Sequence, residues 1–267
     1  MTQQSHQNSL SFLWYNSWRM LWRDWRGGEL TILAIGLIIA VTSITAVGFF
    51  TDRIERGLKQ QSAELIGADL VISSSQQRVT DHIEEARVQN FQVATTTQFR
   101  SMVVNNDQLQ LAEVKAVTEG YPLRGVLRVS DTAFGVDEAT TDIPAPGDVW
   151  VEARLLQMLD LEVGDAINLG ASSFSIRKVL RYEPDRAGDM FSVAPRVLMN
   201  RVDLDATGLV TTGALVSYRV LIAGPGEAIN SYRQAIEDSL EQGERILTVE
   251  EGRPELNTAL ERAQQFL

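Results

Sequence analysis

Hydrophobic and polar positions divide the chain into an apolar segment near its start and a long region of mixed strand and helix patterns. The segment Leu30–Phe50 holds 21 residues without a charged side chain. As a helix rising about 1.5 Å per residue it reaches about 30 Å, the thickness of the hydrocarbon layer of a bilayer. A buried core helix and a cleaved signal peptide are the alternatives, but signal peptides usually have shorter apolar regions that end in small residues. The pattern therefore predicts a retained transmembrane helix at residues 30–50.

A second pattern lies within residues 1–29, before the apolar segment. Four tryptophans recur at helical spacing with arginines beside them, which is typical of an amphipathic helix lying at the membrane surface. A soluble helix that packs its tryptophans into a core is the alternative. We expect a cytoplasmic tail and an interfacial helix here. Its predicted anchor residues are Trp14, Trp18, Arg19, Trp22, Arg23, Trp25 and Arg26.

Helical spacing continues beyond the membrane segment through residues 51–66, up to a plausible terminator at Gly67. A similar leucine spacing in residues 251–267 predicts a second stalk that returns towards a second, missing transmembrane helix. An ordinary C-terminal helix docked on the domain is the alternative. The predicted stalk-packing residues are Ile54, Leu58, Leu65, Leu256 and Leu260.

Strand and helix patterns alternate between the two stalks, in residues 67–250, and predict an α+β domain. A polar stretch at Ser130–Gly147 separates two blocks, and the second belongs to a β-rich subdomain at about 121–205. Asn105–Asp107 suits a hairpin turn. The expected strands are Asp69–Ser73, Phe91–Val104, Gln108–Val117, Val149–Val151, Ala166–Leu169, Ser173–Leu180, Arg196–Met199, Ala214–Ala223 and Arg245–Val249. The expected helices are Asp81–Gln89, Glu152–Leu159 and Gly226–Glu241.

The charge of the chain excludes one class of partner and bears on the orientation of the apolar segment in the membrane. The net charge is −11, and the region after Thr51 is strongly acidic, which argues against a nucleic-acid partner because such surfaces concentrate lysine and arginine. Within about 20 residues of each end of the apolar segment there are three lysine or arginine residues, so charge does not orient it. Because long domains translocate largely regardless of charge, we expect the long region to lie outside the cytoplasm.

Residues that could carry catalysis are few. The chain has no cysteine, only two histidines and neither a G-x-x-x-x-G-K-[ST] nor a G-x-G-x-x-G motif, so we predict no catalytic, cofactor or metal site. We expect both His6 and His82 to be solvated. Glu183, Asp185 and Asp189 form the strongest carboxylate cluster, but they lie in a Pro/Gly turn, where acidic side chains usually make local hydrogen bonds.

Two segments carry a resemblance to a known family. FTDRIERGLKQQSAELIGADLVISSS (Phe50–Ser75) and VEARLLQMLDLEVGDAINLGASSFSIRKVLRYEPDR (Val151–Arg186), together with the arginine-rich start, resemble permease subunits of type VII ABC transporters, the MacB/FtsX/lipoprotein-releasing group, and particularly its YbbP-like branch. The resemblance extends from about Leu10 to Leu267. It implies a MacB-like periplasmic core, with a porter-like α/β part and a small β-rich part, inserted between two transmembrane helices.

The same resemblance implies a function and partners. It suggests the N-terminal part of an inner-membrane permease whose bulk is periplasmic, which couples ATP hydrolysis in a separate cytoplasmic ATPase to export or extraction of a hydrophobic or lipid-like substrate. Its implied partners are the lipid bilayer, the ATPase, a second permease copy or half, and a periplasmic esterase. The later transmembrane helices and the cytoplasmic loop of the family are absent from these 267 residues. A single-span binding or scaffolding module is the alternative, and a membrane-tethered hydrolase lacks plausible catalytic groups.

Overall fold

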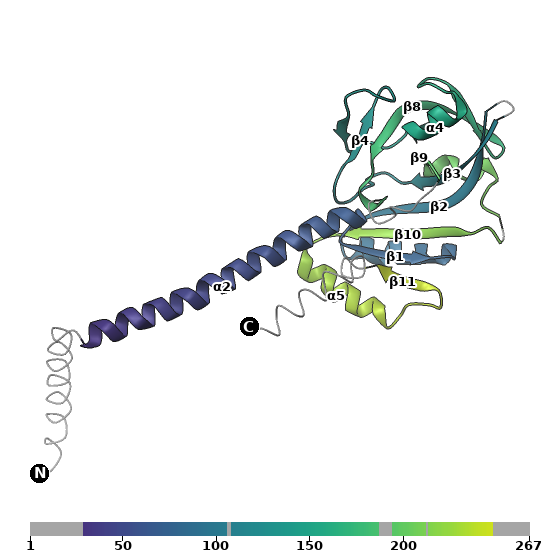
Figure 1. Cartoon of the computed structure of the whole chain (residues 1–267). Helices are drawn as coiled ribbons and strands as arrows, with labels where there is room; N and C mark the ends of the chain where they lie inside the picture. Colours follow the sequence, from purple (N-terminus) through teal and green to yellow (C-terminus); the bar gives the residue numbers. More distant parts are fainter. Residues whose placement is uncertain (1–28, 106–107, 187–193, 212, 248–267) are drawn as a thin grey trace, which may run out of the picture. The chain divides into compact units, whose positions relative to one another are not determined.

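The computed structural model describes residues 29–105, 108–186, 194–211 and 213–247. The chain forms two compact units, Met1–Leu58 and Lys59–Leu267. The described part consists of one long N-terminal helix followed by an α+β domain, as the sequence predicts (Figure 1).

Helix α2 begins at Glu29 and ends at Ile66, so it includes both the predicted membrane segment and the predicted stalk in one run of 38 residues. Its portion Thr31–Thr51 is apolar and long enough to cross a bilayer, and none of it is buried in the protein. Large side chains here, such as Ile32 and Ile44, are more than 70% exposed. Apolar side chains in such numbers need a hydrocarbon environment, which agrees with a transmembrane helix.

The domain is built on one eleven-stranded sheet with the order β11-β1-β10-β2-β3-β9-β6-β8-β4-β5, to which β7 adds by pairing with β2 and β8. Neighbouring strands are antiparallel except for the parallel pairs β3–β9 and β6–β8. The strands are β1 Leu70–Ser74, β2 Gln92–Asn105, β3 Gln108–Val117, β4 Leu127–Ser130, β5 Glu138–Thr140, β6 Asp148–Glu152, β7 Ala166–Leu169, β8 Ser172–Tyr182, β9 Arg196–Asn200, β10 Val216–Ala223 and β11 Glu244–Leu247.

Short helices complete the domain. They are α3 His82–Val88, α4 Ala153–Leu159 and α5 Gly226–Glu237, with the 3-10 turns η1 Gln77–Asp81, η2 Pro184–Arg186, η3 Arg201–Asp203 and η4 Asp205–Thr207. Apolar residues of α3 and α5 pack on one face of β1 and β10 in a core that includes Ile72, Val220 and Ile236. Helix α4 packs in a second core with β3, β6 and β8, and a third core includes Tyr121, Leu127 and Trp150.

The predicted hairpin between β2 and β3 is confirmed. The two strands pair from Thr96 opposite Val117 to Asn105 opposite Gln108, so the chain reverses direction between Asn105 and Gln108, as predicted. Nearly every other predicted strand is found within two residues of its expected bounds. Alternation of buried and exposed side chains is a local property, which explains why it could be recognised without the tertiary structure.

Three details of the prediction were wrong. Strand β4 was missed, and β5 lies within the stretch Ser130–Gly147 that was expected to be a polar connection. At the end of the sheet β5 pairs only with β4, and its side chains are exposed or half-buried, so it has no apolar pattern to recognise. Helix α5 ends at Glu237 instead of Glu241. A single hydrogen-bonded sheet runs through both predicted parts of the domain, so the subdomain at about 121–205 stays a prediction.

Candidate functional site at the junction of helix and sheet

Helix α2 ends at Ile66, and the residue that follows it has a backbone conformation that favours glycine. Gly67 has a φ of +70°, a left-handed conformation that residues with a Cβ adopt at a cost. The backbone N–H groups of Gly67 and Ala68 donate to carbonyl groups of Glu64 and Ala63, which satisfies the last turn of the helix. Ala63 and Ala68 are buried, so the end of the helix is packed into the domain.

Arg124 holds the segment that leaves the helix. Its guanidinium donates from Nε to Oδ1 of Asp69 at 3.0 Å and from Nη2 to Oδ2 at 2.6 Å, and its backbone N–H donates to the carbonyl oxygen of Gly67 at 3.0 Å. Oδ2 of Asp69 also accepts from the backbone N–H of Gly224 at the end of β10. A bidentate Arg–carboxylate pair is charge-assisted and fixes direction as well as distance. We call Arg124, Asp69 and the backbone groups of Gly67 and Gly224 the exit clamp.

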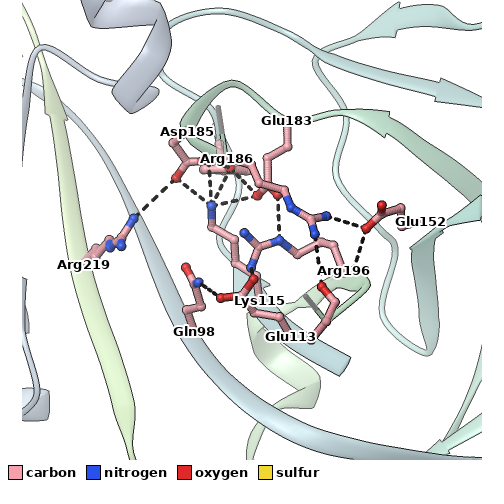
Figure 2. Close-up of polar contacts among 11 residues, drawn as sticks. Gln98, Glu113, Lys115, Glu152, Glu183, Asp185, Arg186, Arg196 and Arg219 are labelled. Carbon is pink, nitrogen blue, oxygen red and sulfur yellow. Dashed lines mark hydrogen bonds and ion pairs between the residues drawn. The ribbon is translucent and has the colours of Figure 1, made fainter. Parts of the chain in front are cut away.

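A buried ionic cluster lies beside the exit clamp. The ammonium group of Lys115, on β3, lies 2.7 Å from Oε1 of Glu183 and 2.6 Å from Oδ2 of Asp185. It also lies 2.8 Å from the hydroxyl oxygen of Tyr121, which itself contacts both carboxylates at 2.8 and 2.6 Å. These four side chains are at most 4% exposed. Figure 2 shows both carboxylates reaching from the turn at η2 towards the lysine.

The cluster extends through Arg196 at the start of β9. Its Nε lies 2.8 Å from Oε2 of Glu183, and its Nη1 lies 3.2 Å from Oε2 of Glu113. Gln98 donates to the other oxygen of Glu113. Glu152 accepts from the backbone N–H of Arg196 and from Nη1 of Arg186 (Figure 2). Strands β2, β3, β6, β9 and the turn η2 therefore meet through charged side chains and the neutral Gln98.

The charges of this cluster balance. It holds four carboxylates and four cations, because Arg219 on β10 adds a longer contact of 3.9 Å to Asp185. The carboxylates are Glu113, Glu152, Glu183 and Asp185, and the cations are Lys115, Arg186, Arg196 and Arg219. A buried charge is costly unless it is paired and hydrogen-bonded, so the balance allows the cluster to be buried. We call these eight residues and Tyr121 the buried cluster.

The protonation states follow from this arrangement. Burial alone would raise the pKa of Glu183, but the positive charges of Lys115 and Arg196 outweigh burial and lower the pKa to about 2. Burial and then the nearby charges of Asp185 and Glu183 raise the pKa of Tyr121 well above its ordinary value. Burial tends to lower the pKa of Arg196, whereas its carboxylate neighbours raise it, with a net increase. Glu183 is therefore ionised, and Tyr121 and Arg196 are protonated, at neutral pH.

The buried cluster also touches the end of the helix. A Cβ placed on Gly67 would lie 3.7 Å from Cβ of Asp185, and one on Gly125 would lie 3.0 Å from Cγ of Pro184 and 3.6 Å from the carbonyl oxygen of Glu64. Gly125, in the loop that carries Arg124, thus lies close to both Pro184 of the turn η2 and the last turn of α2.

The charged groups of this junction bind one another and so connect segments of the chain. Each carboxylate of the buried cluster already contacts a cation, so none is poised as a free general base. In the described ranges, no group of three or more histidine, aspartate or glutamate side chains is placed to hold a metal ion. What the junction can do is hold five segments of the chain at fixed distances.

The structure corrects two predictions about charged residues. Glu183 and Asp185 were expected to make local hydrogen bonds in a turn, but they bind Lys115, which is 68 and 70 residues away in the sequence. His82 was expected to be solvated, but its side chain is only 13% exposed and Nε2 lies 3.1 Å from Oε2 of Glu244. Both errors have one cause, because the partners come from distant strands. Asp189 and His6 lie outside the described residues.

The other predicted site residues lie where the structure gives no side-chain information. The interfacial anchor Trp14, Trp18, Arg19, Trp22, Arg23, Trp25 and Arg26 lies outside the described residues, as do Leu256 and Leu260. Ile54, Leu58 and Leu65 belong to helix α2, but their side chains are not described. Interfacial anchoring and stalk packing therefore stay predictions.

Sequence reasoning missed the residues that build the junction. Lys115, Tyr121, Arg124 and Arg196 were not singled out as candidates. One signal was present for Lys115, because it interrupts the apolar run of the strand that ends at Val117. A lysine in such a position is buried only if carboxylates reach it.

Comparisons with known proteins agree with this architecture. A family model described as the MacB-like periplasmic core domain matches residues 30–253. The chain is 33% identical over 249 residues to the uncharacterized ABC transporter permease YbbP of Escherichia coli strain K12, a match that covers 93% of this chain and 30% of that permease. The chain thus spans about a third of the length of this relative.

Solved structures with similar folds were also found. The periplasmic region of MacB from Actinobacillus actinomycetemcomitans has a TM-score of 0.45 and 13% identity, covering 74% of this chain and 95% of that one. The extracellular domain of the noncanonic ABC-type transporter YknZ from Gram-positive bacteria has a TM-score of 0.43 and 9% identity, covering 67% of this chain and 100% of that one.

Proposed function

Because the chain belongs to the family with a MacB-like periplasmic core domain, we propose that it is the N-terminal part of an ABC transporter permease that couples cytoplasmic ATP hydrolysis to movement of this domain. Its apolar helix anchors it in the inner membrane, and the bulk of the chain is periplasmic. The transported substrate in this proposal is hydrophobic or lipid-like, moved by export or extraction.

The observation that carries the proposal is the connection between α2 and the sheet. The helix has no break from the apolar portion Thr31–Thr51 to Ile66, and the exit clamp starts at the next residue. A helix transmits displacement along its axis because each residue is hydrogen-bonded to the turn before it. The contacts between the end of the helix and the sheet must therefore stay intact while the helix moves.

The exit clamp and the buried cluster have the strength that this connection needs. Hydrogen bonds to charged groups contribute roughly 1.5–3 kcal/mol each, more than neutral ones. Breaking a buried ion pair leaves a charge without a partner and costs roughly 3–5 kcal/mol. The loop that carries Arg124 and the end of β10 at Gly224 would therefore follow the helix exit in preference to separating from it.

The partners in this proposal follow from the ABC transporter permease family to which the chain is related. In this proposal, a separate cytoplasmic ATPase subunit hydrolyses ATP. A second permease copy or half would complete the membrane part, and a periplasmic esterase is a further proposed partner. If the complete protein neither binds nor responds to an ATPase subunit, a membrane-anchored binding or scaffolding module is the better description.

The test uses the complete permease purified with its ATPase subunit. Hydrogen–deuterium exchange of β1, β10 and the loop at Arg124 is measured without nucleotide and with ATP and vanadate. We expect exchange to change with nucleotide in the wild type, and Asp69→Asn to suppress that change while the rate of ATP hydrolysis is kept. Asp148→Asn, which breaks the exposed pair with Arg177, is the matched control. An unaltered response in Asp69→Asn would show that the exit clamp does not transmit movement.

A further inference from the structure

One face of the sheet is not covered by α3 and α5. These helices pack on the face that carries Ile72 and Val220. Because side chains alternate along a strand, the neighbouring residues Ser73 and Arg219 point to the other face. The strand register places Arg245, Ser73, Arg219 and Thr96 in one row across β11, β1, β10 and β2. Figure 1 shows β10 running between β1 and β2.

The same face continues along β2 towards the hairpin. Gln98, Arg100, Met102 and Val104 follow Thr96 at every second position, so all five side chains belong to this face. From Thr96 to Val104 the strand spans about 26 Å at roughly 3.3 Å per residue. We call the surface formed by Arg100, Met102, Leu109, Leu111, Arg219 and Arg245 the open face.

The exposed charges of the open face are positive, although the whole chain has a net charge of −11. Arg100 and Arg245 are exposed, and neither forms an ion pair with another residue of the described ranges. The side chain of Arg219 is only 26% exposed and contacts Asp185 of the buried cluster at 3.9 Å, so Arg100 and Arg245 supply most of the exposed charge. Glu113 shares this face, but it is buried and lies beside Arg196, while Asp185 is buried against Lys115. The open face therefore presents cationic groups to an outside partner.

Apolar side chains complete the open face at the hairpin. Met102 lies directly opposite Leu111, and these side chains are 41% and 43% exposed. Leu109 lies opposite Val104 and is 61% exposed. Val103, on the opposite face of this hairpin, is buried, so the face that carries Met102 and Leu111 is the one that faces solvent. The solvated face of an antiparallel pair normally carries polar residues, so these exposed apolar side chains are unusual. Contiguous exposed apolar residues beside polar ones mark an interaction surface.

We propose that the open face binds a partner protein that presents acidic side chains next to an apolar patch. A sheet face that carries exposed side chains on several strands suits a protein, because sites for small molecules are concave whereas protein interfaces extend over a broad, flatter area. The positive charges select an acidic partner, since complementary charges increase the association rate and reject partners of like charge. This surface acts in partner binding whether or not the exit clamp transmits movement.

Site-specific photo-crosslinking tests this inference in the complete protein in its own membranes. A photo-reactive amino acid replaces Leu109, and the same group at Val88, an 80% exposed apolar residue on α3, is the control. We expect Leu109 to capture a protein of acidic isoelectric point and Val88 not to capture it. A charge variant combines Arg245→Glu with Arg100→Gln; glutamine is used at 100 because Glu113 lies directly opposite. Its capture should fall about fivefold or more.

Arg87→Glu on α3 is the matched control for charge, and it should leave capture at Leu109 unchanged. Thermal unfolding of each variant shows that the domain remains folded. The inference is overturned if the product at Leu109 is a second copy of this chain, a lipid or a basic protein, or if no product exceeds that at Val88. Capture that persists in the arginine variant also overturns it, because the charges would then not select the partner.

Discussion

The amino nitrogen of Lys115 lies 2.7 Å from Oε1 of Glu183, and both side chains are only 1% exposed. The two residues come from β3 and from the segment after β8, so their contact ties two distant parts of the sheet together. Water would normally stabilise both charges, and here it is replaced by the opposite charge and by the hydroxyl group of Tyr121. The buried cluster consequently depends on each of its members.

Replacing Lys115 should destabilise the domain strongly. In Lys115→Met, Glu183 and Asp185 lose their shared cation, and we expect the free energy of unfolding to fall by about 3–5 kcal/mol. Urea unfolding of the detergent-solubilised chain measures this. Lys178→Met removes the exposed lysine paired with Glu138 and should cost about 1 kcal/mol or less. Similar losses in the two variants would contradict the importance of burial.

The lowered pKa of Glu183 predicts an acid-sensitive domain. Its pKa is about 2 in the folded protein against an ordinary value of 4.5. Because the folded pKa is the lower one, ionisation of Glu183 stabilises the fold above about pH 4.5, and this stabilisation is lost as the pH falls towards 2. Urea unfolding at several pH values should show the decline, and Glu183→Gln should make the pH dependence shallower. An equal dependence in the variant would assign the acid sensitivity to other groups.

The exit clamp should show energetic coupling between its two charged residues. A double-mutant cycle of Asp69→Asn and Arg124→Gln should give an interaction energy of about 1–2 kcal/mol, the lower part of the range for charged hydrogen bonds because both groups are partly exposed. The comparison cycle uses Asp148 and Arg177, an exposed pair with a single contact, and should give less than about 1 kcal/mol. Equal interaction energies in the two cycles would mean that the bidentate geometry of Asp69 and Arg124 does not strengthen their interaction.

Gly57 inside helix α2 and Gly67 directly after it should respond oppositely to replacement by alanine. Gly67→Ala forces a Cβ into a left-handed conformation and should cost about 1–2 kcal/mol, since the surrounding atoms at 3.6 Å or more leave space for the methyl group itself. Gly57 lies inside the helix with open space around it, so Gly57→Ala should stabilise by up to about 1 kcal/mol. Thermal unfolding distinguishes the two. A loss of stability in both would point to a different role for the helix.

The stalk prediction can be tested in the complete transporter. If Leu58 and Leu65 pack against the returning stalk, replacing both with aspartate should disrupt coupling between ATP hydrolysis and periplasmic movement, because carboxylates resist burial. Cargo movement and the ATPase response are the measurements. Both should remain normal if these leucines face solvent.

The apolar span, the hairpin and most strands of this protein could be predicted from the amino-acid sequence alone. Each depends on residues that are near one another in the chain, through the length of an apolar run or the alternation of side chains along a strand. The family could also be recognised from the sequence, because the resemblance rests on two contiguous segments of the chain. The strands that were missed, β4 and β5, have too little local pattern to be recognised.

The contacts of the charged residues, in contrast, become visible only in the folded domain. The sequence shows Glu183 and Asp185 in a turn, where solvation is the ordinary state of a carboxylate. Whether Lys115 reaches them depends on the parallel pairing of β3 with β9 and on the path of the chain after β8, neither of which has a local signature. Long-range electrostatic partners follow from topology and register, because two charges interact through their separation in space and not through their separation along the chain.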